Sequence, residues 1–205
     1  REKLFQFDID VTMRDVNIGP SVVQYTLQPH EGIKLNKITT LKNDLALALA
    51  AKSIRMEAPI PGKSLVGIEV PNDKRMVVRL REMLESEEFL SVKSKLRLPI
   101  GRDVAGLPVI DDLFSMPHLL IAGATGSGKS VCMNTFLIGL LYQNSPEDLR
   151  MIMVDPKRVE LTTYNSIPHL LTPVITDADK AHMALKWAVS EMNRRYRLFA
   201  EKKYR

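Results

Sequence analysis

The chain has 205 residues, and 29 Lys and Arg against 24 Asp and Glu give it a net charge of +5. With 45% apolar and 26% charged residues, it has the composition of a globular protein, which excludes a collagen-like, low-complexity or broadly disordered chain. The single cysteine excludes an internal disulfide framework and an all-cysteine zinc site. A charge of +5 permits a polyanionic partner but does not by itself indicate one.

The first half of the chain is predicted to be a small α+β domain over residues 1–98. Phe5, Phe7, Ile9 and Val11 alternate with polar residues, which predicts a half-buried strand over residues 5–12. Apolar residues at helical spacing predict a helix over residues 36–55, which Pro59 to Gly62 would end. Further elements are expected as strands at residues 22–27 and 65–70 and a short helix at residues 76–84.

The second half, residues 99–205, has the pattern of an α/β domain with a parallel sheet. A wholly apolar run at residues 119–122 and a second apolar strand expected over residues 150–154 are typical of strands buried on both faces. A helix is expected between them, from about Lys129 to Gln143, and a long amphipathic helix over residues 178–203. Strand, loop, helix and strand in this order form the βαβ unit of a parallel sheet.

The loop between the first apolar run and the helix carries the chemistry. Residues 123–130, Gly-Ala-Thr-Gly-Ser-Gly-Lys-Ser, match the phosphate-binding pattern G-x-x-x-x-G-K-[ST] in full. Glycines let the backbone approach a phosphate, and successive amide groups together with the following helix N-terminus attract an anion. We predict ATP as the cofactor, held by Thr125, Gly126, Ser127, Gly128, Lys129, Ser130 and Val131.

Two side chains of this loop have specific predicted roles. The Lys129 ammonium is expected to reach the β- and γ-phosphates and act in catalysis, and the Ser130 hydroxyl to ligate Mg2+. Asp155, at the end of the second apolar run, is a second catalytic candidate, close to the γ-phosphate or its water. The alternative for Asp155 is a helix cap or a loop salt bridge with Lys157 or Arg158.

Short motifs along nearly the whole chain resemble the FtsK/SpoIIIE family of bacterial DNA translocases. The family pattern carries these residues in this order: Gly19-Pro20, Gly32 to Leu35, Leu41 to Ala46, Ala58 to Lys63, Gly67 to Asn72, Gly101 to Pro108, Met116 to Gly123, the loop itself, Asp155 to Lys157, Ile167 to Leu171 and Glu191 to Tyr196. Arg102 departs from the pattern, since many members have Lys there, although the charge is kept.

The resemblance implies an α domain over residues 1–98, which assembles a ring, and the first part of a RecA-like ATPase β domain over residues 99–205. It also implies a motor that moves double-stranded DNA in chromosome segregation during cell division or sporulation. Six identical subunits would form the ring and hydrolyse ATP at their interfaces. The alternatives are a ring ATPase for conjugation or protein secretion, and a nucleotide-binding piece without hydrolysis.

We interpret the chain, which opens Arg1-Glu2-Lys3, as a piece of a longer protein. By resemblance, the acidic strand that completes hydrolysis, the arginine acting on a neighbouring subunit and the DNA-facing loops would follow residue 205. The chain alone is therefore expected to lack full activity and to leave most DNA contacts to other regions. We expect it to be cytoplasmic and to make no membrane contact, while the longer protein would be anchored in the cytoplasmic membrane.

Other residues admit a structural interpretation beside a functional one. Basic residues near the C-terminus indicate either a DNA-binding stripe or, as we favour, a solvated helix face. Cys132 is expected to be a small core residue, and His118 and His169 to be structural. The turn at Arg102 and Asp103 either reaches a neighbouring subunit's nucleotide or is a surface turn. The basic residues in question are Arg194, Arg195, Arg197, Lys202, Lys203 and Arg205.

Overall fold

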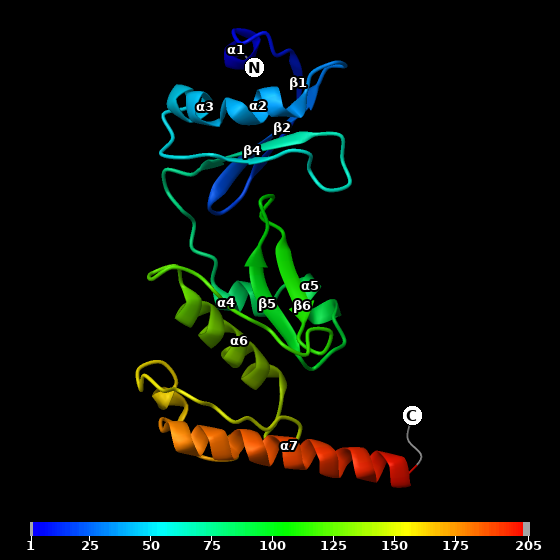
Figure 1. Ribbon diagram of the computed structural model, residues 1–205, viewed down its shortest axis with the longest axis vertical. Helices are drawn as coiled ribbons and strands as arrows, with labels where there is room; N and C mark the ends of the chain where they lie inside the picture. The colour runs from blue at the N-terminus through cyan, green and yellow to red at the C-terminus, as the bar shows by residue number, and fades with distance from the viewer. Residues whose placement is uncertain (1, 203–205) are drawn as a thin grey trace. The chain divides into compact units, whose positions relative to one another are not determined.

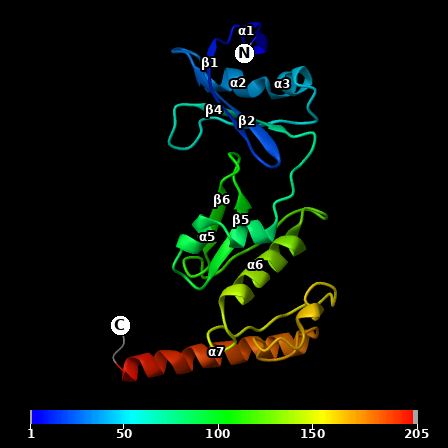
Figure 2. The same cartoon turned by 180° about the vertical axis from the view of Figure 1, so that it is seen from behind.

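The computed structural model describes residues 2–202, so Lys203 and Arg205 of the basic cluster lie outside the described part. The chain forms two compact units, Arg1–Leu120 and Ile121–Arg205. The first unit contains all the named strands, and the second contains the two longest helices (Figures 1 and 2). The predicted boundary at residue 98 falls inside the first of these units.

A four-stranded antiparallel sheet forms the N-terminal part of the first unit. Its strands lie in the order β1 (Val11–Ile18), β2 (Val22–Pro29), β4 (Val66–Pro71) and β3 (Arg55–Glu57). Every neighbouring pair is antiparallel, and β1 carries a register shift between Met13 and Val16. Strands β2 and β4 confirm the predictions made for residues 22–27 and 65–70.

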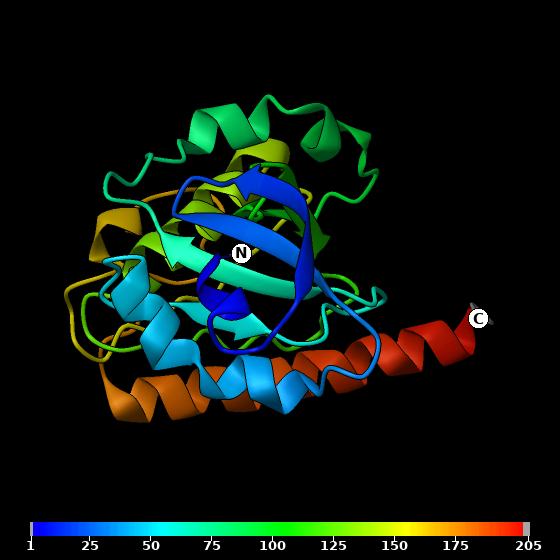
Figure 3. The same cartoon turned by 90° about the horizontal axis from the view of Figure 1, so that it is seen from above.

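Three helices also contribute to this core: α1 (Glu2–Phe5), α2 (Leu35–Thr40) and α3 (Lys42–Ala48). Ile38 of α2 and Leu45 of α3 are buried in one cluster with apolar residues of the sheet, beside which both helices run in Figure 3. The cluster removes these side chains from water, which is the main force that holds the helices on the sheet. Its buried members are Leu4, Ile9, Val11, Leu27, Ile38, Leu45, Ile54, Val66 and Ile68.

Two predictions for this region are wrong in part. The strand expected over residues 5–12 begins only at Val11, because Leu4 and Ile9 are the buried residues while Phe5 and Phe7 are 67% and 46% exposed. The helix expected over residues 36–55 is two short helices that meet at Leu41, and it ends before Ala50, whose φ is +51°. A non-glycine residue in the left-handed region does not continue a helix.

The remainder of the first unit is a β-hairpin with two short helices. The hairpin joins β5 (Arg97–Arg102) to β6 (Pro108–Asp112), and α4 (Leu80–Leu84) and α5 (Glu87–Ser91) contact β5 and β6 respectively. Only the short helix at residues 76–84 was predicted from the sequence, and it begins at Leu80.

The second unit is built around α6 (Lys129–Gln143) and α7 (Ala178–Glu201), with one turn of 3-10 helix at Thr162–Tyr164. Helix α6 has the predicted bounds. Helix α7 begins at the predicted Ala178 and ends at Glu201, and the predicted end at residue 203 lies outside the described residues. Buried Met153, Leu161 and Val174 form the core of this unit. The α6 side chains that pack against this core are Met133 and Leu137.

The parallel sheet predicted for the second half is not formed within residues 2–202, where both sheets are antiparallel. Residues 119–122 have no strand, and residues 150–154 form two isolated parallel bridges, Met151 with Leu170 and Val154 with Ile175. A buried parallel strand needs neighbours at its sides and cover on both faces. Leu120 is 90% exposed, so its run has no such cover in the described chain.

Helix α7 is capped by Asp177, whose carboxylate accepts the amides of Asp179 and Lys180. None of its residues is buried in the described chain, and Trp187 is 49% exposed. Among residues 2–202, no helix combines the length and the apolar character that a membrane crossing requires.

Candidate nucleotide-binding site

The glycine-rich loop leads directly into the N-terminus of α6. Gly126 and Gly128 have φ values of +77° and +96°, in the left-handed region that glycine adopts without strain. Gly128 is the N-cap of α6, and no side chain caps the helix there. The first hydrogen bond of the helix runs from the Cys132 amide to the Gly128 carbonyl, 2.8 Å, so the preceding amides have no partner within the helix.

The Lys129 side chain folds back over this loop. Its ammonium donates to the carbonyl oxygens of Gly123 and Ala124, at 2.8 and 2.9 Å. Gly123 also permits a close approach of the chain, because a Cβ there would lie 2.4 Å from the Ser127 hydroxyl. The cation is thus held at the mouth of the loop, where a phosphate oxygen could compete with the two carbonyls for it.

The Ser130 hydroxyl donates to a carboxylate that sequence analysis did not select. Its Oγ lies 2.9 Å from Oε1 of Glu160. A second polar link runs beside it: the Asn134 amide donates to the Ser130 carbonyl at 2.8 Å, and the Tyr164 hydroxyl donates to Asn134 at 2.5 Å. The first turns of α6 are therefore joined to the segment 160–164.

Asp155 contacts that segment and is buried, with 5% of the residue exposed. Its Oδ2 accepts the backbone amides of Glu160 and Leu161, both at 2.9 Å. The Leu161 amide lowers the pKa of Asp155 below its ordinary value; burial opposes this shift, and further backbone amides, including that of Glu160, add to it. Asp155 thus binds backbone amides of the loop that follows it, in place of the helix cap or the salt bridge with Lys157 or Arg158 that was considered as its alternative.

The predicted catalytic residues Lys129 and Asp155 line one pocket of about 370 Å3 in the second unit, together with Glu160. The loop residues Thr125, Gly126, Ser127, Gly128 and Val131 are exposed along the chain that precedes and begins α6. Residues that line the pocket are Ile121, Lys129, Met133, Val154, Asp155, Pro156, Lys157, Glu160 and Leu161.

Glu160 belongs to no phosphate-binding motif, and its spacing of five residues from Asp155 carries no recognised signal. Its position depends on the turn at Arg158, whose φ is +59°, and on the amide contacts to Asp155. The only sequence hint was that an acidic side chain follows soon after the apolar run 150–154, on the side where ligands gather in α/β sheets.

The turn of the β5–β6 hairpin uses both residues that were considered for contact with a neighbouring subunit. Asp103 Oδ1 accepts the amides of Ala105 and Leu107 at 2.8 and 2.9 Å. The Arg102 guanidinium donates to the Gly106 carbonyl at 2.8 Å. These are the contacts of a surface turn that is stabilised by its own side chains.

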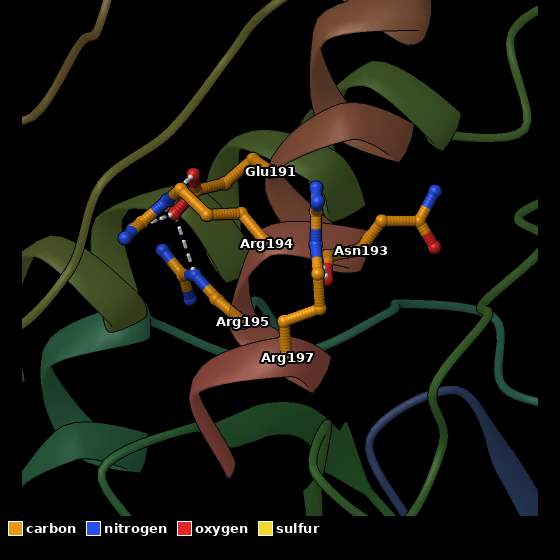
Figure 4. A network of polar contacts seen from close by, with 5 residues as sticks. All are labelled: Glu191, Asn193, Arg194, Arg195 and Arg197. Carbon is orange, nitrogen blue, oxygen red and sulfur yellow. Dashed lines mark hydrogen bonds and ion pairs between the residues drawn. The ribbon is translucent and has the colours of Figure 1, made fainter. Parts of the chain in front are cut away.

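The basic cluster of α7 is partly neutralised on its own helix. The Glu191 carboxylate accepts from Arg194 and Arg195, with shortest distances of 2.7 and 2.8 Å (Figure 4). Hydrogen bonds from Arg194 and then Arg195 lower the pKa of Glu191 to about 2. Pairs at spacings of three and four residues on an exposed helix are typical of a solvated face.

The surroundings of Cys132 and His169 indicate structural roles for both side chains. Cys132 is half-buried in the first turn of α6, and burial raises the pKa of its thiol, which disfavours the reactive thiolate. The buried ring of His169 is hydrogen-bonded through Nε2 to the Asn144 carbonyl at 2.9 Å.

Comparisons with known proteins show which family the chain resembles. Residues 79–205 match the FtsK/SpoIIIE family, and residues 1–72 match the FtsK alpha domain. The "DNA translocase FtsK" of Caldanaerobacter subterraneus is 56% identical over 200 residues, which cover 98% of this chain and 28% of that protein. The "DNA translocase SftA" of Bacillus subtilis is 53% identical over 201 residues, which cover 94% of this chain and 21% of that protein.

One solved structure, the pCW3 conjugation coupling protein TcpA in its monomer form with ATPγS, aligns over 99% of this chain and 56% of its own. Its sequence identity is 23% and its TM-score 0.49.

A glycine-rich loop of full P-loop sequence, opening a helix in a mixed α/β chain, defines a protein of the P-loop class. The chain belongs to the FtsK/SpoIIIE family. The resemblance inferred from its motifs is thereby confirmed. The chain spans about a quarter of the length of the curated relatives.

Proposed function

We propose that the chain is the nucleotide-binding portion of an ATP-driven motor that moves double-stranded DNA. The observation that carries this proposal is the loop 123–130, with its two left-handed glycines at the N-terminus of α6, in a chain of this family. The curated relatives bear the name DNA translocase, and the identity of more than 50% extends over nearly the whole chain. Hydrolysis at the interfaces of a homo-hexameric ring is part of the proposal, as is a role in chromosome segregation.

In this proposal the amides of residues 125–131 bind the phosphates of ATP. Lys129 exchanges its two carbonyl acceptors for phosphate oxygens, which bind an ammonium more strongly because they are charged. We assign Lys129 and, as the acidic group near the γ-phosphate, Asp155 to catalysis. Asp155 also has a structural role, because its carboxylate accepts the backbone amides of Glu160 and Leu161.

The side chains beside the loop also fit Mg2+. The Ser130 hydroxyl provides an oxygen donor of the kind that this ion prefers, and the Glu160 carboxylate, 2.9 Å away, accepts the hydrogen bond of that hydroxyl. When bound, Mg2+ would neutralise charge on the β- and γ-phosphates. Ser130 would be the protein ligand of the ion.

We further propose that the N-terminal α+β part serves ring assembly, with residues 1–98 as the α domain and residues 99–205 as the first part of the ATPase domain. The alpha-domain match ends at residue 72 and the family match begins at residue 79, which supports this order of the two parts. Double-stranded DNA would be contacted mostly by regions other than this chain. By analogy with the family, the motor would work in the cytoplasm, attached to the cytoplasmic membrane by another region.

The proposal is tested on the full-length protein that contains this chain, by its rate of ATP hydrolysis with and without double-stranded DNA. We expect duplex DNA to raise the rate, and Lys129→Ala to lower it roughly 100-fold or more, because a charge aimed at the phosphates is removed. Lys186→Ala, an exposed position on α7, is the matched control and is expected to hydrolyse ATP as the unaltered protein does. A rate that duplex DNA leaves unchanged would overturn the translocase proposal.

A further inference from the structure

We propose that Glu160 is a positioning residue for Ser130: it fixes the direction of the hydroxyl so that the oxygen lone pairs are available to Mg2+. This inference rests on the proposed nucleotide function and adds to it a residue outside the P-loop motif. It concerns how the metal ligand is oriented, which the motif alone does not specify.

The chemistry of the two groups sets the direction of the contact. A serine hydroxyl has one proton and two acceptor lone pairs, whereas a carboxylate only accepts. Over the 2.9 Å from Ser130 Oγ to Glu160 Oε1, the hydroxyl must therefore donate. Its proton is directed at Glu160, and both lone pairs are left for a cation.

Glu160 itself is held from its backbone. The Asp155 carboxylate accepts the amide of Glu160 at 2.9 Å, and the neighbouring Leu161 is 8% exposed, in the core of the second unit. The turn at Arg158 precedes it. The backbone of Glu160 is therefore fixed in position, and this places its side chain within reach of α6.

A second polar contact joins the same two segments, the start of α6 and residues 160–164. Asn134 lies one turn beyond Ser130 on α6, and Tyr164 lies four residues beyond Glu160. The Tyr164 hydroxyl donates to Asn134, which in turn donates to the Ser130 carbonyl. Two polar links thus set the rotation of α6 relative to segment 160–164, and with it the distance from Ser130 to Glu160.

Residues that orient a metal ligand are commonly worth about 10- to 100-fold in metal affinity. If Glu160 acts in this way, its loss weakens nucleotide binding only when Mg2+ is present. If Glu160 acted only through its negative charge, its removal would strengthen the binding of nucleotide without Mg2+, because the nucleotide is an anion. The metal dependence therefore separates the two causes.

The test measures the Kd of ATP for the full chain, in Mg2+ and again in EDTA. For Glu160→Ala we expect binding to weaken by about tenfold or more in Mg2+ and to change by less than about twofold in EDTA. Glu160→Gln keeps an oxygen acceptor without the charge, so it should retain part of the affinity that Glu160→Ala loses. Glu147→Ala, an exposed glutamate of the same unit, should bind as the unaltered protein does in both conditions.

A double-mutant cycle with Ser130→Ala shows whether Glu160 acts through the hydroxyl. We expect Glu160→Ala to have no further effect on Mg2+-dependent binding when Ser130 is already alanine, because the group to be oriented is gone. Additive losses would mean that Glu160 acts independently of Ser130, and they would overturn the inference.

Equal affinity of Glu160→Ala and the unaltered protein for ATP in Mg2+ would likewise overturn it, as would tighter binding. Glu160→Gln, together with the thermal unfolding midpoint of each variant, separates a loss of positioning from a loss of folding. Failure of the unaltered protein to bind ATP at all would instead refute the proposed function.

Discussion

The carboxylate of Asp155 accepts the backbone amide of Glu160, with 2.9 Å between Oδ2 and N. Asp155 thus holds the backbone of Glu160, whose carboxylate accepts the hydroxyl of Ser130. Asp155 receives the Leu161 amide as well, so one buried side chain closes the turn after residue 155. A mutation at Asp155 should therefore affect both the fold of this unit and the position of Glu160.

We expect Asp155→Asn to lower the stability of the chain in a pH-dependent way. Backbone amides, chiefly that of Leu161, lower the pKa of Asp155 in the folded state. A lowered folded pKa stabilises the fold above the unfolded value of about 3.9, and this contribution is lost as the pH falls through the folded value. The advantage of the unaltered protein over Asp155→Asn should be full at about pH 7 and smaller at about pH 3, as measured by urea unfolding.

Asp73→Asn, at an exposed position of the first unit, is the control for that comparison. A constant difference between Asp155→Asn and the unaltered protein from about pH 7 to about pH 3 would contradict the prediction. Asp155→Asn also tests the catalytic assignment: a kcat at saturating ATP equal to that of the unaltered protein would contradict a role of the carboxylate at the phosphates.

Gly128→Ala should lower both stability and nucleotide affinity. The φ of +96° at Gly128 is in the region that costs an L-residue about 1–2 kcal/mol, so the variant should lose roughly that much free energy of unfolding. Relief of the strain would turn the amides at the start of α6 away from the loop, and ATP binding should weaken severalfold. Urea unfolding and a Kd for ATP measure the two effects.

Gly62→Ala provides a matched control for Gly128→Ala. Gly62 has a φ of +73°, and no atom lies within 4 Å of the position that a Cβ would take there, so alanine introduces comparable strain outside the second unit. We expect a similar loss of stability with unchanged ATP affinity. If Gly62→Ala weakened ATP binding as much as Gly128→Ala does, the loop would not be the cause.

Local patterns predicted the elements that local interactions determine. Helix α6 was predicted with its bounds because Gly128 and the apolar residues that follow are both signals within the segment. The strands at residues 119–122 and 150–154 were predicted from apolar character alone, which says that a segment is to be buried but not by what. Without paired neighbours in the described chain, these runs form at most isolated bridges.

The site was predictable only as far as its motif. Lys129 and Ser130 were assigned from spacing, and their loop has the expected left-handed glycines. Glu160 was missed because its contact with Ser130 joins residues 30 positions apart and depends on the turn at Arg158. The spacing of apolar residues along a sequence predicts helices and strands, but it does not predict a tertiary contact of this kind.

Gly19→Ala should destabilise the first unit through a backbone clash. A Cβ at Gly19 would lie 2.7 Å from the carbonyl oxygen of Val104, and 3.0 Å from its carbonyl carbon, so the turn between β1 and β2 could not keep its approach to the β5–β6 turn. We expect a loss of about 1–3 kcal/mol in the free energy of unfolding, measured with urea. Ser21→Ala, in the same turn, adds no atom and is the control. Because the clash involves backbone atoms, truncation of the side chain in the double variant Gly19→Ala, Val104→Ala should not restore stability, and a full recovery there would show that the Val104 side chain is what the new methyl group meets.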